Sequence, residues 1–386
     1  MNSLRPTQLL VNLSQLRRNL LAIRQRVYPA RVLVMLKANA YGHGLEGVAP
    51  FIEPEVDAIG VAVLDEGMAL RRMGIRKPIL VAGGCLPEQI PQYLAHDLTL
   101  TVSSLEILDS AEAAARAAGK TLTVHLKIDT GMERAGTRWY ESAPLLERSL
   151  SCRHLTLEGI YTHFANSETP ESPALKRKRG YAAPSAQLER FAEVLDFYAR
   201  RSLPPPPLRH AANSGAILNL PQSFFDMVRP GILFYGIYPG PDCAKTVEVA
   251  PAATWISRVF YSKITRAQAP VSYGSLWNGA TDVTTVTVPC GYADGYFRRN
   301  TNRASVIVNG KKYLQVGRIC MDQFMVNLGG DTARLGDEVI LLGRAASGAI
   351  ISPEDLAEWA GTNAYEVMTN ISARVPRVFL RGDTVQ

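Results

Sequence analysis

The residue with the clearest chemical potential is Lys37, which follows the uninterrupted apolar run Val32–Leu36 and precedes the segment Ala38–Gly44. A short continuous apolar run with β-branched residues predicts a buried strand. An amine at the end of such a strand is partly desolvated, so it can act as a nucleophile, a base or a Schiff-base former. On these residues alone, a lysine that simply leaves a strand for solvent is the commoner case.

Polar residues of different kinds also stand at the ends of later apolar runs. They are Lys127, Asp129, His163, Asn213, Ser214 and Arg229. The carboxyl ends of parallel barrel strands meet at one face, so these groups are expected to converge with Lys37. Each has a structural alternative: His163 could be a core histidine, Arg229 an ion-pair partner and Ser214 a helix cap. The set is more informative than any one member.

The segment Val228–Ile232 contains Gly231, which exposes backbone N–H groups after the last predicted barrel strand. Ser214 adds a hydroxyl after the preceding strand. Loops after the last two strands are the usual phosphate site of such barrels. The sequence therefore predicts a lysine near one end of a ligand and a phosphate cradle at the other.

A competing motif is Gly42-His-Gly44-Leu-Glu-Gly47, which matches the G-x-G-x-x-G dinucleotide fingerprint. That fingerprint needs the turn to begin as the strand ends. Here the strand ends near Lys37, five residues before the first glycine. A nicotinamide-dependent enzyme therefore stays the alternative.

The elements that position these residues follow two different sequence patterns, one in each part of the chain. Up to about residue 245, short apolar runs alternate with segments of helical periodicity such as Leu13–Val27, which predicts a (β/α)8 barrel. The predicted strands are Val32–Leu36, Ala58–Val63, Pro78–Ala82, Leu98–Val102, Leu122–Ile128, Leu157–Phe164, Leu208–Asn213 and Phe225–Arg229.

From residue 246 onward, short alternating runs separated by turn signals predict a mainly antiparallel β domain. The predicted strands are Trp255–Arg266, Thr281–Pro289, Ala304–Val308, Tyr313–Val316, Gln323–Asn327 and Glu338–Leu342. Ser352 and Pro353 predict the start of a helix. We therefore expect a barrel domain over 1–245 and a β domain over 246–386, with the first ten or so residues as candidates for pairing with the second.

Composition fits this plan. The 386 residues are 47% hydrophobic and 20% charged, which is typical of globular proteins. The net charge of +7 is spread along the chain, and the one tight basic run, Lys176–Arg179, predicts a solvated surface rather than a nucleic-acid site.

Five widely spaced cysteines have no metal or redox spacing and favour a reducing compartment. The first residues lack the pattern of a signal peptide, and no apolar stretch is long enough to cross a bilayer. We expect a cytoplasmic protein with no metal and no binding to nucleic acid or membrane.

A series of motifs runs in order along nearly the whole chain: Val34–Gly44, Lys127–Arg134, Thr162–Ala165, Ala212–Ser214, Val228–Ile232, Val271–Gly274, Gly291–Gly295, Arg318–Gln323 and Tyr365–Val367. This series resembles the alanine racemases, fold-type III enzymes that depend on pyridoxal 5′-phosphate (PLP) and combine a barrel with a β domain. The resemblance implies a head-to-tail homodimer that interconverts L- and D-alanine and supplies D-alanine for the peptidoglycan of the cell wall.

The resemblance also implies roles for two acid/base groups. Lys37 would form a Schiff base with PLP and serve as one acid/base. Tyr273, from the other subunit, would serve on the opposite face of the substrate α-carbon. Two groups suit racemisation, because a proton is removed from one face and returned on the other.

For the cofactor, the resemblance places Arg229 at the pyridine nitrogen and His163 in a hydrogen bond with Arg229. A fixed cation there weakens the electron sink and limits transamination. The phosphate would be bound by Tyr41, Ser214, Gly231, Ile232 and Tyr365.

For the substrate carboxylate, the family uses positions that match Arg134 and the backbone of Met321, the latter also from the other subunit. Lys127 matches a lysine that is carbamylated in several family members and orients Arg134. Tyr292 and Asp322 would support the site.

Glu133 departs from the family, which often has glycine at that position. The new carboxylate beside Arg134 leaves the conformation of that loop and the carbamylation of Lys127 open. A broader or serine-preferring amino-acid racemase and a PLP-holding barrel without turnover are the alternatives.

Overall fold

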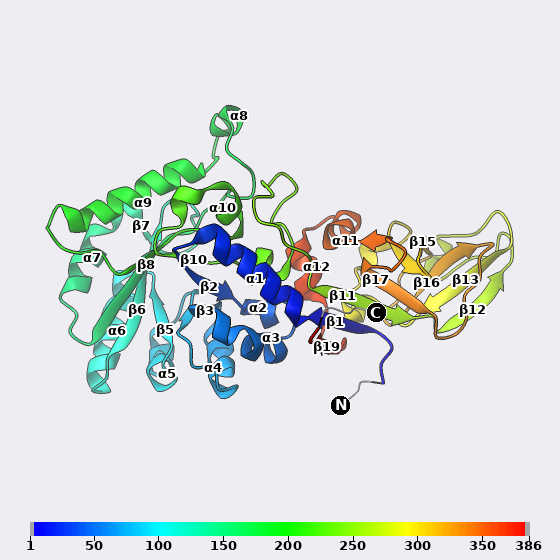
Figure 1. Ribbon diagram of the computed structural model, residues 1–386, viewed down its shortest axis with the longest axis horizontal. Helices are drawn as coiled ribbons and strands as arrows, with labels where there is room; N and C mark the ends of the chain where they lie inside the picture. Colours follow the sequence, from blue (N-terminus) through cyan, green and yellow to red (C-terminus); the bar gives the residue numbers. More distant parts are fainter. Residues whose placement is uncertain (1–3, 383–386) are drawn as a thin grey trace. The chain divides into compact units, whose positions relative to one another are not determined.

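The computed structural model describes residues 4–382. The chain divides into two compact units (Figure 1). One contains Arg17–Ala40 and Glu46–Val249. The other contains the residues up to Leu16, the short segment Tyr41–Leu45 and the residues from Ala250 onward.

The first unit is an eight-stranded parallel barrel, as predicted from the alternation of apolar runs with segments of helical periodicity. Its strands in neighbouring order are β10 (Met227–Val228), β2 (Arg31–Met35), β3 (Ala58–Val61), β4 (Ile79–Val81), β5 (Thr99–Val102), β6 (Leu122–Asp129), β8 (Leu155–Tyr161) and β9 (Leu208–His210). The ring closes between β9 and β10, where the Asp226 N–H donates to the Arg209 carbonyl over 3.0 Å. A short strand, β7 (Thr137–Arg138), pairs with β6.

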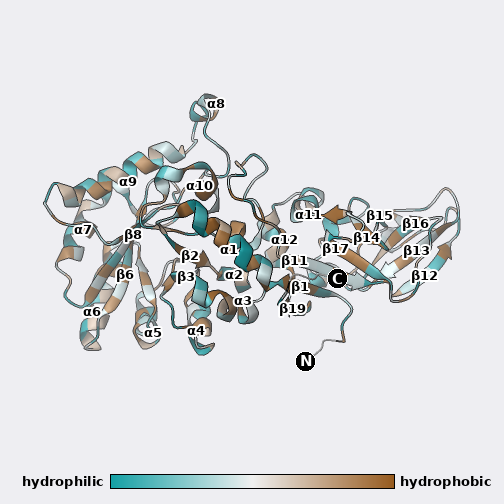
Figure 2. Ribbon diagram, in the orientation of Figure 1, coloured by the Kyte–Doolittle hydropathy of each residue, from teal (hydrophilic) through white to brown (hydrophobic). Residues whose placement is uncertain are grey.

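Helices alternate with these strands (Figure 1). They are α1 (Leu13–Val27), α2 (Lys37–Tyr41), α3 (Leu45–Ile52), α4 (Leu64–Arg72), α5 (Ile90–Ala95), α6 (Leu105–Ala117), α7 (Ala143–Leu150), α8 (Pro173–Lys176), α9 (Pro184–Ala199) and α10 (Ser214–Asn219). The predicted periodicity of α1 is confirmed: Leu16, Leu20 and Ile23 are fully buried. Apolar and polar residues alternate along this helix (Figure 2).

The second unit is built on a mixed, mostly antiparallel sheet. Its strands in neighbouring order are β12 (Tyr261–Thr265), β13 (Val283–Val288), β16 (Phe324–Gly329), β15 (Lys311–Val316), β14 (Ser305–Val308), β17 (Glu338–Arg344), β11 (Ala253–Arg258), β1 (Gln8–Asn12) and β19 (Arg377–Leu380), with β18 (Ile350–Ile351) beside β17. The chain's first strand, β1, pairs antiparallel with β11 and parallel with β19.

One predicted strand is wrong in extent. The run Trp255–Arg266 is two strands, β11 and β12, because the chain breaks at Val259–Phe260 and the halves take different partners. No Gly, Pro, Asn or Asp stands at the break, so no turn signal in the sequence revealed it.

Two helices complete this unit, α11 (Pro353–Ala360) and α12 (Ala364–Asn370). The predicted N-cap of α11 is confirmed. The Ser352 hydroxyl accepts from the Asp355 N–H over 3.0 Å, and the Asp355 carboxylate accepts from the Ser352 N–H over 2.7 Å. This reciprocal capping box satisfies two backbone donors at the helix start.

Candidate active site

Lys37 lies where β2 ends. The N–H of Leu36 donates to the Gly60 carbonyl over 2.8 Å, so the chain is held against β3 up to the residue before Lys37. The following residues, Ala38 to Ala40, are left-handed, with φ between 53° and 55°. L-residues rarely adopt this conformation because Cβ approaches the carbonyl oxygen. The strand end and the left-handed turn together determine where the amine stands.

The environment of Lys37 favours its neutral form. Burial lowers the pKa of its amine, the positive charge of Arg134 lowers it further, and Glu66 acts in the opposite direction. A neutral amine carries the lone pair that a nucleophile or base needs.

Lys127, near the end of β6, is buried. Burial and then the charge of Arg229 lower the pKa of its amine to about 7. The amine lies 5.0 Å from the centre of the Tyr161 ring. Lys127 is therefore a second lysine with a substantial neutral population near neutral pH.

Arg229 follows β10 and is 4% exposed. Its guanidinium donates to the carbonyls of Thr162 (2.8 Å) and Ala211 (3.0 Å) and to the Nδ1 atom of His210 (2.8 Å). Burial lowers the pKa of Arg229 to about 10, so it remains a cation at neutral pH. These contacts fix a positive charge inside the barrel.

His163 lies next to Arg229 and is influenced by the charges of three further basic residues. Its Nδ1 atom is 3.3 Å from the Nη2 atom of Arg229. Burial lowers the pKa of His163 well below its usual value. The charges of Arg229, Lys127, Arg134 and Lys37 add to this effect in that order. The fold thus gathers the basic residues that the sequence placed on separate strands, and it keeps His163 neutral.

Ser214 and Gly231 form the loop pair predicted as a phosphate cradle. The Ser214 hydroxyl accepts from the N–H groups of Gly231 (2.9 Å) and Leu233 (3.3 Å). Ser214 begins α10, whose N-cap Asn213 accepts from the Ala216 N–H over 3.0 Å. Ile232 is fully buried and begins the single turn that follows Gly231. Hydroxyl and backbone N–H groups therefore converge in the barrel, as anion binding requires.

The loop that carries Arg134 is organised by Asp129. Its carboxylate accepts from the N–H groups of Gly131 (2.8 Å), Met132 (2.9 Å) and Arg134 (3.2 Å). This arrangement presents the exposed Arg134 side chain beside Lys37.

Glu133 has a left-handed backbone, with φ at 51°. This conformation explains why a glycine would suit the position. The ion pair of Glu133 is made with Arg138, over 3.4 Å, and both side chains are at least half exposed. The Glu133 carboxylate, which the sequence places beside Arg134, thus has Arg138 as its ion-pair partner.

The second unit carries two further predicted phosphate ligands. The rings of Tyr41 and Tyr365 have centroids 6.2 Å apart, with Tyr365 on α12. Gly42 next to Tyr41 packs so closely on α12 that an added Cβ would lie 2.1 Å from the Met368 carbonyl oxygen. Close packing thus accounts for the first glycine of the G-x-G-x-x-G match.

Tyr273 stands on an exposed turn of the second unit, with 70% of its surface accessible in the single chain. Ser272 before it is left-handed, with φ at 65°, and its hydroxyl donates to the Arg318 carbonyl over 2.6 Å. This contact ties the Tyr273 turn to the segment that leads to Met321.

The turn that carries Tyr292 packs against the same segment. The N–H groups of Tyr292 and Ala293 donate to the carbonyls of Cys320 (3.1 Å) and Met321 (3.0 Å). An added Cβ at Gly291 would lie 2.3 Å from the Met321 oxygen, so only glycine permits this approach. Tyr273, Tyr292 and Met321, which are far apart in sequence, thus belong to one cluster of turns.

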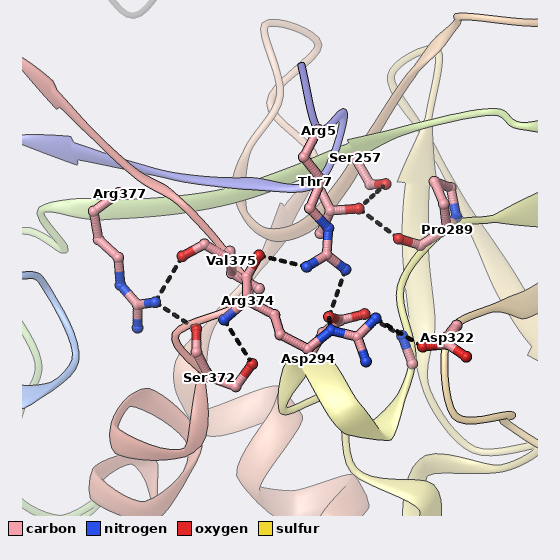
Figure 3. A network of polar contacts seen from close by, with 11 residues as sticks. Arg5, Thr7, Ser257, Pro289, Asp294, Asp322, Ser372, Arg374, Val375 and Arg377 are labelled. Atoms are coloured by element: carbon pink, nitrogen blue, oxygen red, sulfur yellow. Dashed lines mark hydrogen bonds and ion pairs between the residues drawn. The ribbon is translucent and has the colours of Figure 1, made fainter. Parts of the chain in front are cut away.

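A polar network around the buried side chain of Asp294 anchors these turns (Figure 3). Asp294 is fully buried and accepts from Arg5, while Arg374 lies 3.4 Å from it. Arg374 also donates to Asp322 over 2.7 Å. Asp294 accepts from the Gly291 N–H over 3.0 Å, so the network stiffens the Tyr292 turn from within.

Sequence reasoning missed the partners of Arg229 inside the barrel. His210 ends β9 and accepts from Arg229, and the Tyr161 ring stacks on His210 with centroids 4.6 Å apart. A histidine at the end of the run Leu208–Asn213 was the available signal. The convergence of strand ends that directed attention to His163 applies equally to it.

Within residues 4–382, no group of three or more His, Cys, Asp or Glu side chains is arranged to hold a metal ion. None of the helices there is long and apolar enough to span a membrane. All five cysteines are free thiols.

The chain matches two family models along most of its length. Residues 11–239 match the alanine racemase N-terminal domain, and residues 252–379 match the alanine racemase C-terminal domain. The alanine racemase of Carboxydothermus hydrogenoformans is 40% identical over 381 residues, covering 98% of this chain and 100% of that protein.

Comparison with solved structures points to the same family. The alanine racemase of Clostridium difficile 630 superposes with a TM-score of 0.89 at 34% identity, covering 98% of this chain and 97% of that one. A histidine racemase from Leuconostoc mesenteroides superposes with a TM-score of 0.87 at 27% identity, covering 98% of each chain.

Fold and site therefore define an isomerase built from a (β/α)8 barrel and a β domain. The chain belongs to the alanine racemase family.

Proposed function

We propose that this chain is a PLP-dependent alanine racemase that interconverts L- and D-alanine, with Lys37 and Tyr273 as its two proton-transfer groups. The observation that carries the proposal is the desolvated amine of Lys37 at the end of β2, in the same cluster as Arg229, Lys127 and Arg134. Racemisation at an α-carbon needs a group that transfers the proton and a cation that holds the substrate carboxylate, and this cluster supplies them as the amine of Lys37 and the guanidinium of Arg134.

The residues present fit PLP. Its aldehyde needs a neutral amine, and burial and Arg134 favour that form of Lys37. Its phosphate needs hydroxyl and N–H donors. The Ser214 hydroxyl accepts from the Gly231 N–H and keeps its own proton to donate, and we assign Ser214 and Gly231 to the phosphate. Ile232, Tyr41 and Tyr365 are the further residues that we assign to the phosphate.

Arg229 is assigned to the pyridine nitrogen. PLP withdraws electrons from the α-carbon of an amino acid bound to it and so makes the α-proton acidic. A guanidinium that remains charged leaves the ring nitrogen without a proton, which weakens this withdrawal and favours return of the proton to the α-carbon. His163 supports Arg229 as a neutral neighbour.

Proton transfer is assigned to two side chains on opposite faces of the substrate. Lys37 Nζ removes or returns the α-proton on one face, and the Tyr273 hydroxyl does so on the other. The 70% exposure of Tyr273 in the single chain supports its insertion into the site of a partner subunit. We therefore propose a head-to-tail homodimer, in which residues 1–245 and Tyr365 of one chain bind the cofactor, and Tyr273 and Met321 in the β domain of the other chain complete the site.

The substrate carboxylate is assigned to Arg134 and to the backbone of Met321 from the partner subunit. Tyr292 and Asp322 support Met321 through the turn contacts and the Arg374 ion pair described above. Lys127 is assigned as a carbamylated lysine. An anion on its nitrogen would orient the Arg134 guanidinium by a charge-assisted hydrogen bond.

In the cell, we place this activity in the cytoplasm, where it would supply D-alanine to peptidoglycan synthesis. The alternative is a racemase of broader or serine-preferring specificity. One methylene or hydroxyl in a pocket changes the relative rates of two substrates only modestly. A histidine racemase has a related fold, so racemases of this fold differ in the amino acid on which they act.

A racemisation assay against a panel of L-amino acids tests both activity and specificity. We expect alanine to give the highest kcat/KM, and the purified protein to be yellow with an absorption band that borohydride changes irreversibly. A colourless protein that binds a nicotinamide cofactor would refute the proposal. A preference for serine would establish the alternative.

Subunit mixing tests the shared site. Lys37→Ala and Tyr273→Phe should each be inactive alone, whereas their equimolar mixture should regain about a quarter of wild-type activity. Half of the dimers formed by random exchange are mixed, and each of those has one intact site of two. Tyr140→Phe, another exposed tyrosine, is the matched control and should keep full activity. No recovery in the mixture would remove Tyr273 from a trans role.

A further inference from the structure

A continuous line of hydrogen bonds runs from Arg229 through the interior of the barrel. Arg229 Nη1 lies 2.8 Å from His210 Nδ1, and His210 Nε2 lies 2.9 Å from His125 Nδ1. His125 Nε2 then lies 3.0 Å from the Glu158 carboxylate. His210 is fully buried and His125 is 2% exposed, whereas the Glu158 side chain is 34% exposed. The line therefore joins the cationic cluster to solvent.

The far end of the line lies at the opposite face of the barrel from Lys37. Glu158 and His125 line a pocket together with residues from the beginnings of the strands, among them Arg31, Ala58 and Thr99. The side chains of Lys37, Lys127 and Arg229 stand at the carboxyl ends instead. Glu158 is thus remote from the reacting atoms.

The direction of proton donation along this line follows from chemistry alone. Arginine can only donate, so His210 Nδ1 must be bare and its proton must sit on Nε2. That proton requires a bare Nδ1 on His125, whose own proton then sits on Nε2 and points at Glu158. A carboxylate can only accept, so Glu158 is a suitable partner for the N–H at His125 Nε2, the last donor of the line.

The barrel is shaped for this line. Gly159 pairs with His125 across β6 and β8, and an added Cβ at Gly159 would lie 2.6 Å from His125 Nδ1. The register between β6 and β8 shifts just before His125. The Tyr161 ring stacks on His210 within 9° of parallel. A small residue, a bulge and a stacked ring therefore hold both imidazoles in place.

Charges along the line agree with this assignment. Burial and then the charge of Arg229 lower the pKa of His210 well below its usual value, so His210 is neutral. The hydrogen bond from His125 lowers the pKa of Glu158, so its carboxylate is ionised at neutral pH.

We propose that Glu158 is a positioning residue for the racemase: from the far face of the barrel it accepts the proton of His125 Nε2, holds His125 and His210 in the tautomers that Arg229 requires, and through them orients Arg229. The proposal deepens the function assigned above, because it rests on Arg229 acting at the pyridine nitrogen. Arg229 and Glu158 favour the same tautomers from the two ends of the line, and without the carboxylate the N–H at His125 Nε2 has no acceptor there, which weakens this preference. The reversed tautomers would bring two N–H groups face to face at His210 or Arg229.

The first test needs no variant and no substrate. In the wild-type holoenzyme labelled with 15N-histidine, nitrogen shifts and long-range proton couplings distinguish the protonated nitrogen of each ring. We expect His125 and His210 to carry their protons on Nε2. A proton on Nδ1 of either residue would overturn the proposal, whatever the enzymatic activity proves to be.

The second test removes the carboxylate. Glu158→Leu should change the tautomer distribution of His210 and lower kcat about tenfold with a smaller change in KM, since a buried N–H loses its partner. It should also raise the rate at which bound PLP is lost to transamination, read from the absorption spectrum. Glu158→Gln keeps an acceptor for His125 and should restore most of the kcat.

Glu112→Leu is the matched control. Glu112 makes the same kind of bond, 2.9 Å from its carboxylate to His154, but His154 is partly exposed and belongs to a separate pair. This variant should leave kcat and the His210 signals unchanged. Equal behaviour of Glu158→Leu and Glu112→Leu would overturn the proposal even if both proteins fold and racemise alanine.

Discussion

Lys127 offers the sharpest test of how burial prepares this site. The perturbation is the supply of carbon dioxide to the holoenzyme at controlled pH. A neutral lysine amine adds to carbon dioxide, forming the N–C bond of a carbamate and releasing one proton. A protonated amine has no lone pair and does not react.

The magnitude follows from the pKa of Lys127, which burial and then Arg229 lower from 10.5 to about 7. At pH 7 about half of the amine is neutral, against about one part in 3,000 for an ordinary lysine. Burial therefore raises the reactive population about 1,500-fold. Raising the pH from 6 to 8 moves the neutral fraction from about 0.1 to about 0.9, so carbamate should accumulate in that window and be lost on acidification.

The assay is 13C NMR of protein equilibrated with 13C-labelled bicarbonate. We expect one carbamate resonance at pH 8 that weakens strongly at pH 6. Lys127→Met should lack it, and Lys120→Met, which removes an exposed lysine of the same unit, should retain it. No resonance at pH 8, or one that survives in Lys127→Met, would refute the reasoning.

The remaining predictions concern the loops around the site. Asp294→Asn should lower the free energy of unfolding by about 2 kcal/mol and raise the KM for alanine. The substitution removes a buried charge that faces Arg5 and Arg374, whose partial exposure reduces the usual penalty for breaking a buried pair. Denaturant titration with Asp331→Asn, at an exposed ion pair, as control checks this; equal shifts would contradict it. Glu133→Gly should stabilise the protein by up to about 1 kcal/mol, because glycine adopts a φ of 51° without strain. A lower unfolding midpoint in the same titration would contradict that expectation.

Much of the barrel could be predicted from sequence, for a physical reason. Parallel strands are buried on both faces, so each appears as a short apolar run, and all eight predicted runs overlap observed strands. The same logic located Lys37, because a basic residue that directly ends such a run stands at the carboxyl edge of the sheet. The motif series then identified the family without any coordinates.

The β domain was predicted less completely. Alternation marks a half-buried strand but does not show where the chain changes partner, so the run Trp255–Arg266 hid the break between β11 and β12. Ser352 was recognisable because a helix cap depends only on residues close in sequence.

What the sequence by itself determined is the order of the elements, the family and the residues at strand ends, since these depend on local patterns. Only the tertiary structure decided which groups meet. The partners Arg5 and Asp294 are 289 residues apart, and no local pattern joins them. His125 and Glu158 lie on different strands, and their hydrogen bond exists only because β6 and β8 are neighbours whose register shifts just before His125. The lowered pKa of Lys127 likewise requires burial beside Arg229, which follows from closure of the barrel.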